Sequence, residues 1–97
     1  MLDLEEDQRV LVRSILAQHL PHAQVWAFGS RVQGRAWKFS DLDLAIDAGH
    51  VLDFRTMAML KDAFQESRLP IKVDVLDLRT VSPEFRKLID EQRVAMA

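Results

Sequence analysis

The sequence has no cysteine and no tyrosine, and it contains no long hydrophobic run. Without cysteine, neither disulfides nor thiolate metal sites can form. No apolar run approaches the roughly 20 residues that span a bilayer, so we expect no association with a membrane. The N-terminus, MLDLEEDQ, is acidic where a signal peptide is basic, so we expect the protein to be cytoplasmic.

The sequence also has no basic excess, because 13 Lys and Arg residues face 15 Asp and Glu residues and give a net charge of −2. Domains that bind nucleic acid unaided usually carry a clear positive excess, so we expect no independent nucleic-acid binding. The 97 residues include 48% hydrophobic side chains, which is enough for a buried core. We therefore expect one domain that covers residues 1–97.

Hydrophobic spacing predicts three helices and three strands. The helical periodicity covers residues 4–19 and 54–67 and begins again at Ser82. Runs of β-forming residues predict strands over 23–28, 41–47 and 71–76, and residues 31–34 are expected to form a single helical turn. The tail from residue 93 shows no pattern. The predicted order αββαβα indicates an α/β fold with a small mixed β-sheet flanked by helices.

The same periodicity predicts which side chains of the second and third helices face the core. Met59 lies off the apolar stripe of the second helix, so it is expected to be exposed and is a candidate for a partner surface. The residues expected to point inward are Phe54, Met57, Leu60, Lys61 and Phe64 in the second helix, and Phe85, Leu88 and Ile89 in the third.

Two aspartates stand one residue apart on an otherwise apolar strand. Alternation along a strand sends Asp41 and Asp43 to one face and Leu42 and its apolar neighbours to the other. Carboxylates held together raise each other's pKa unless a cation lies between them, and Mg²⁺ prefers such oxygen ligands. A third acid, Asp74, interrupts the last predicted strand. These acids could also be solvated on an exposed sheet face, but Asp is a poor strand former, which favours a functional site.

A Gly-Ser pair, Gly29-Ser30, ends the first predicted strand. Glycine lets the backbone approach a ligand closely, and the serine hydroxyl and the following N–H groups can hold phosphate oxygens. Arg31, Arg35 and Lys38 follow; each could bind a polyphosphate or be an ordinary solvated loop charge. A strand, Gly-Ser, ten residues and then Asp-x-Asp would place a phosphate cradle and a metal-binding pair in one pocket.

Gly29-Ser30, ten residues, Asp41-x-Asp43 and a later strand acid at Asp74 together resemble the signature of the DNA polymerase β-like nucleotidyltransferase superfamily. The run GSRVQGRAWKFSDLDLAID is most similar to its minimal nucleotidyltransferase (MNT) branch, which includes the antitoxin partners of HEPN toxins. The resemblance covers nearly the whole chain.

This resemblance implies a role for each residue of the motif. The family often has Ala-Arg where this chain has Val32-Gln33, so Arg31 or Arg35 would have to replace that arginine. Two Mg²⁺ ions would promote displacement at the α-phosphate of ATP. The residues implied to be catalytic and to hold the metal are Asp41, Asp43 and Asp74, and those implied to bind the nucleotide are Gly29, Ser30, Arg31 and Arg35.

The resemblance further implies that the chain moves AMP from ATP to a tyrosine of a HEPN-type toxin and silences it. Because this chain has no tyrosine, it cannot modify itself on that side chain, which fits an acceptor on a partner protein. Two other interpretations stay open. The domain could neutralise or scaffold its partner by contact alone, with a weak or idle nucleotide pocket, or it could be an α/β domain that binds no nucleotide.

Overall fold

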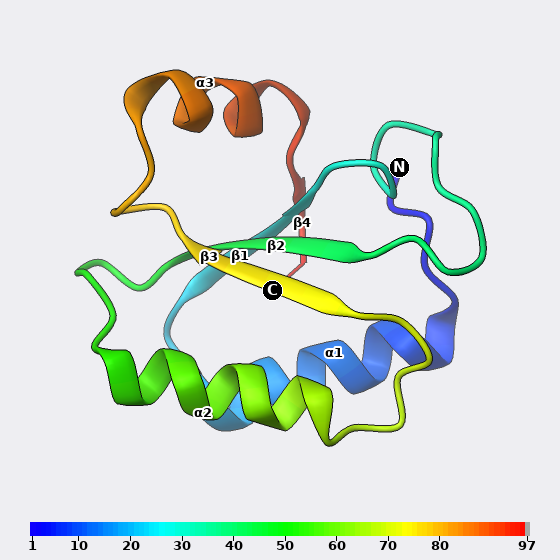
Figure 1. The fold of residues 1–97 in the computed structure, drawn as a ribbon, viewed down its shortest axis with the longest axis horizontal. Helices are drawn as coiled ribbons and strands as arrows, with labels where there is room; N and C mark the ends of the chain where they lie inside the picture. Colours follow the sequence, from blue (N-terminus) through cyan, green and yellow to red (C-terminus); the bar gives the residue numbers. More distant parts are fainter. Residues whose placement is uncertain (97) are drawn as a thin grey trace.

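The computed structural model describes residues 1–96 as three helices packed around a mixed sheet. Ala97, the last residue of the unpatterned tail, lies outside the described residues. The elements are α1 (Glu6–His19), β1 (Gln24–Phe28), β2 (Leu42–Asp47), α2 (Phe54–Gln65), β3 (Val73–Asp77), α3 (Pro83–Gln92) and β4 (Val94–Ala95). Figure 1 shows α1 and α2 on one face of the sheet and α3 on the other. No helix within residues 1–96 is long and apolar enough to cross a membrane.

The strands lie side by side in the order β3-β2-β1-β4. The pairs β1–β2 and β1–β4 are antiparallel, whereas β2–β3 is parallel, so the prediction of a mixed sheet flanked by helices is confirmed. The predicted order lacked β4, which pairs with Trp26 and Ala27 of β1. Two residues are too short for strand alternation to be visible in a sequence. The observed order is therefore αββαβαβ.

Alternation in the central strands builds the core. Val25 and Ala27 of β1 and Leu42, Leu44 and Ile46 of β2 are buried on the face that α1 and α2 cover. On the other face a smaller cluster packs beneath α3, made of Phe28, Ala45, Leu78 and Ile89. The polar side chains of β2 share this second face, so the fold directs them away from the main core.

Three apolar residues that were predicted to face the core are exposed instead. Phe54, the first residue of α2, is 89% exposed, and Phe85 and Leu88 of α3 are 38% and 51% exposed. Helical periodicity identifies a face but does not show how far the neighbouring sheet extends beneath it, so positions near a helix end or outside the packed patch are misassigned. Met59 is 52% exposed, as predicted, and its role in a partner surface stays a prediction.

Candidate active site

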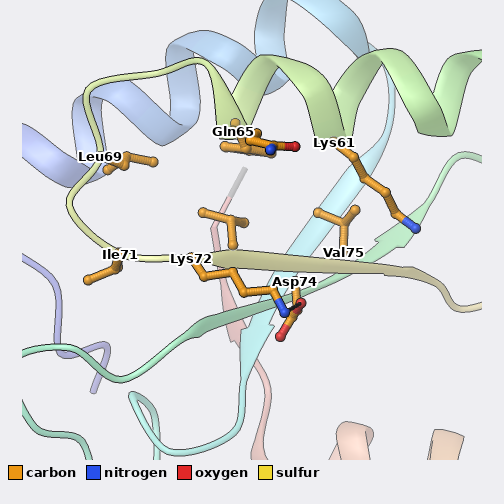
Figure 2. A pocket seen from close by; sticks show the side chains of 9 residues that line it. Lys61, Gln65, Leu69, Ile71, Lys72, Asp74 and Val75 are labelled. Carbon is orange, nitrogen blue, oxygen red and sulfur yellow. Dashed lines mark ion pairs between the residues drawn. The ribbon is translucent and has the colours of Figure 1, made fainter.

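The parallel pairing of β2 with β3 brings two of the three acids together. Asp43 lies directly opposite Asp74 in the register, and Asp41 immediately precedes β2. Because paired residues of neighbouring strands point to the same face, the carboxylates of Asp43 and Asp74 lie on one side of the sheet. Figure 2 shows the side chain of Asp74 pointing away from Val75, which faces α2. The acids therefore occupy the face opposite the main core.

The Gly-Ser turn lies against the same carboxylate. Phe28, the last residue of β1, pairs with Asp43, and Gly29 follows with a φ of 84°. A β-carbon at Gly29 would overlap the Oδ2 atom of Asp43, so only glycine allows this approach. The Gly29 N–H donates to Oε1 of Gln92 at 2.6 Å, which ties the turn to α3. The backbone bend predicted to hold phosphates thus directly contacts the central acid.

The residues after Gly29 form hydrogen-bonded turns and no helix, so the predicted helical turn over 31–34 is only partly formed. The N–H groups of Val32 and Gln33 donate to the Gly29 carbonyl at 3.0 and 3.2 Å. Within residues 1–96, the N–H groups of Ser30 and Arg31 have no protein acceptor. Unpaired N–H groups beside a glycine bend are the usual means of holding phosphate oxygens.

The acids are electrostatically crowded. Burial raises the pKa of Asp43 above its ordinary value, and the neighbouring carboxylates of Asp74 and Asp41 raise it further, while Lys72 partly opposes them. Lys72 Nζ lies 3.3 Å from Oδ1 of Asp74, an exposed ion pair (Figure 2). A cation between the acids would relieve the repulsion that raises the Asp43 pKa.

The donor set suits a hard divalent cation, because it consists only of carboxylate oxygens on one face. In the described part of the chain, however, no three His, Cys, Asp or Glu side chains are already arranged to hold a metal. The ammonium group of Lys72 pairs with Asp74. The side chains of Lys72 and Asp74 are both exposed enough to rotate, so a divalent cation would require the carboxylates to turn toward it.

The two arginines predicted to contact the nucleotide differ in their surroundings. Arg31 is 5% exposed, and its guanidinium group donates to the backbone carbonyls of Ser40, Asp3 and Lys38 at 2.9, 2.9 and 3.1 Å. Its donors are therefore committed to holding the loop that leads to the acids and to fixing the N-terminal segment. These bonds indicate a structural role for Arg31, and its contact with the nucleotide stays a prediction. Arg35 is exposed and hydrogen-bonded to Oε1 of Gln33, and its contact with a phosphate also stays a prediction.

Replacing Arg31 with methionine is expected to destabilise the fold by about 2–3 kcal/mol, because several partly buried backbone carbonyls lose a charged donor. Chemical denaturation with a fluorescence readout would measure the loss. The matched variant Arg35→Met should change the free energy of unfolding by no more than about 0.5 kcal/mol, because the side chain is exposed. Equal stability of the two variants would contradict the structural role of Arg31.

Two polar residues beside the acids, Gln92 and Lys72, were not predicted from the sequence. Gln92 contacts Gly29 although the two residues are 63 positions apart in the sequence, and no local pattern predicts such a contact. Lys72 precedes Asp74 by two residues, so strand alternation alone would have placed the two side chains on one face. Lys38, weighed as a phosphate ligand, lies with its ammonium group over the ring of Phe39.

A mixed sheet with paired acids on two adjacent strands and a glycine bend against them defines a nucleotidyltransferase fold of the polymerase β type. The family model described as polymerase beta, nucleotidyltransferase matches residues 11–96. A Haemophilus influenzae protein named probable protein adenylyltransferase MntA is 51% identical over 88 residues, which is 91% of this chain and 77% of that protein.

Solved structures agree with this assignment. A toxin–antitoxin crystal structure with AMP-PNP contains a chain that is 27% identical, with a TM-score of 0.77 over 92% of this chain and 72% of that one. A mutant MntA–HpeT toxin–antitoxin contains a chain that is 28% identical, with a TM-score of 0.72 over 95% and 71%. The chain therefore belongs to the polymerase β nucleotidyltransferase family, in the minimal branch that includes MntA, and it is a nucleotidyltransferase.

Proposed function

We propose that this chain transfers AMP from ATP to a hydroxyl group of a partner protein in a Mg²⁺-dependent reaction, and that the partner is a HEPN-type toxin which the transfer silences. The main support for the proposal is the position of Asp43, which lies opposite Asp74 and in contact with the Gly29 bend. The names of the similar proteins, an adenylyltransferase and a toxin–antitoxin with AMP-PNP, support the nucleotide and the class of partner.

In this proposal the backbone of Ser30 and the following residues holds the phosphates, and Arg35 neutralises part of their charge. Asp41, Asp43 and Asp74 hold the metal, and Asp74 also faces the acceptor. A bound divalent cation would supply charge neutralisation on the triphosphate and a lower pKa for the attacking hydroxyl. The hydroxyl oxygen bonds to the α-phosphorus while the bond to pyrophosphate breaks, and the hydroxyl proton passes to the carboxylate of Asp74.

The direct test is mass spectrometry of the partner. We expect incubation of this chain with ATP, Mg²⁺ and the product of the neighbouring open reading frame to add the mass of one or more AMP units to that product. Omitting Mg²⁺ with EDTA should prevent the gain. Replacement of ATP by α,β-methylene-ATP, in which the bond between the α- and β-phosphates cannot be cleaved, is the matched control and should give no adduct.

A second candidate function is neutralisation by contact, with an idle pocket. Two observations favour it. Lys72 forms an ion pair with the carboxylate of Asp74, and Arg31 donates hydrogen bonds to the backbone carbonyls of Ser40 and Asp3. A stable complex with the partner that never gains mass under any nucleotide would support this function and would overturn the transferase proposal.

A further inference from the structure

The outer edge of β3 is a row of unpaired backbone groups beside the active site. The strand stands at the end of the sheet order and has only β2 as a neighbour. Leu42 N–H donates to the Lys72 carbonyl and Leu78 N–H donates to the Ile46 carbonyl, each at 2.9 Å. The N–H and C=O groups of successive strand residues point to opposite sides. Those of the even-numbered residues from 72 to 78 therefore point toward β2 and form hydrogen bonds with it. The N–H and C=O groups of Val73 and Val75 therefore point outward.

These free groups flank Asp74 on both sides in sequence. A new strand that paired along this edge would place one of its residues opposite Asp74. The side chain of that residue would point to the same face of the sheet, with its β-carbon about 4.5–5.5 Å from that of Asp74 in an antiparallel pair. A hydroxyl at this position would lie next to the carboxylate that faces the acceptor in the proposed reaction.

The neighbouring positions of such a strand would point the other way, into a cleft of about 510 Å³ between α2 and β3. Lys61 and Gln65 of α2 form its polar wall, and Phe64, Leu69 and Val75 form apolar parts of its surface (Figure 2). The ammonium group of Lys61 would attract a carboxylate one residue away from the hydroxyl.

From this geometry we infer that the acceptor docks by adding an extended segment to the β3 edge, with a hydroxyl residue opposite Asp74 and an acidic residue next to it in the cleft. Main-chain pairing supplies affinity and alternate side chains supply specificity, as in other strand additions. A second copy of this chain fits less well, because antiparallel pairing of two β3 strands about Asp74 would place like charges opposite each other. The inference rests on the proposed function and adds how its acceptor is held.

Amide hydrogen exchange tests the docking without requiring catalysis. In the complex with the product of the neighbouring open reading frame, we expect the Val73 and Val75 amides to exchange at least about tenfold more slowly than in the free chain. The amide of Ala95, which faces away from β1 at the opposite edge of the sheet, is the matched control and should not change. Unchanged exchange at Val73 and Val75, absence of a complex, or protection by self-association at equal concentration would overturn the inference.

A backbone variant tests whether the edge delivers the acceptor. Proline is tolerated where a strand N–H points outward, so Val75→Pro removes one free donor without touching the β2 pairing. We expect Val75→Pro to lower AMP transfer to the partner at least about tenfold, with AMP-PNP affinity within about twofold. Ala95→Pro removes an outward-pointing N–H at the opposite edge of the sheet, and should transfer AMP at the rate of the unchanged chain.

The outcomes separate the two proposals. Full transfer by a folded Val75→Pro variant overturns edge docking and leaves the transferase function in place. Protection of the edge amides without any AMP transfer by the unchanged chain overturns the transferase function and supports docking. If Val75→Pro does not fold, the exchange measurement on the unchanged chain decides the docking by itself.

Discussion

Asp43→Asn is expected to abolish AMP transfer while leaving the fold intact. Asparagine keeps the size of the side chain but removes the negative charge that lies against the Gly29 bend and opposite Asp74. Loss of a residue that only hydrogen-bonds to a metal ligand lowers metal affinity or activity about 10–100-fold. Loss of a direct ligand should therefore lower the rate of AMP transfer at least about 1,000-fold. The measurement is the initial rate of AMP transfer to the partner at saturating ATP and Mg²⁺. Transfer within tenfold of the unchanged rate would refute the assignment.

The raised pKa of Asp43 also predicts how the Asp43→Asn variant changes the pH dependence of the free energy of unfolding. A carboxyl whose folded-state pKa is raised binds its proton more tightly in the folded protein than in the unfolded chain, for which about 3.9 is ordinary. The free energy of unfolding should therefore fall as pH rises from about 4 through the raised value. In EDTA, Asp43→Asn should lack this fall and be at least as stable as the unchanged chain at pH 7.

Asp47→Asn is the matched control, because Asp47 lies on the same strand and is part of no proposed site. Hydrogen bonds from Gly49 N–H at 2.9 Å and from Arg79 Nε at 3.0 Å lower its pKa, the Gly49 bond most strongly. The stabilisation from this carboxylate is present above about pH 4 and is lost as pH falls through the lowered value. Asp47→Asn should therefore lose about 1 kcal/mol at pH 7 and keep AMP transfer.

Most of the fold and the composition of the site could be predicted from local patterns in the sequence. The alternation in 41–47 fixed which side chains of β2 enter the core, and it placed Asp43 on the opposite face, where the structure has it. The parallel pairing with β3 was not visible in either segment alone, because register depends on how both strands pack beneath α2. Once that register forms, Asp74 comes opposite Asp43.

The features that could not be predicted depend on contacts between residues that are far apart in the sequence. Arg31 reads in sequence as a loop cation beside a phosphate site, yet its guanidinium group is buried among carbonyls of Asp3 and of the loop before Asp41. Nothing within a few residues of Arg31 shows that the N-terminal segment returns to it. The exposure of Phe54 and Leu88 has a related cause, because a single helix does not reveal the extent of the sheet that covers it.

Gly29→Ala is expected to damage stability and catalysis together. The backbone at this residue has a φ of 84°, which costs an L-residue roughly 1–2 kcal/mol. The added methyl group would also overlap Oδ2 of Asp43 and force the carboxylate or the turn to move. We expect a total loss of about 3 kcal/mol in the free energy of unfolding, and at least about 100-fold slower AMP transfer, because a misplacement of 1 Å can cost that much.

Gly34→Ala separates the two causes, since Gly34 has a similar φ of 72° but no atom within 4 Å of an added β-carbon. This variant should lose only the roughly 1–2 kcal/mol of backbone strain and keep transfer within a few-fold. Thermal melts and transfer rates on the two variants then isolate the contact between the Gly29 bend and Asp43. If both variants lose the same stability and the same activity, that contact has no special role, because backbone conformation alone would explain the requirement for glycine.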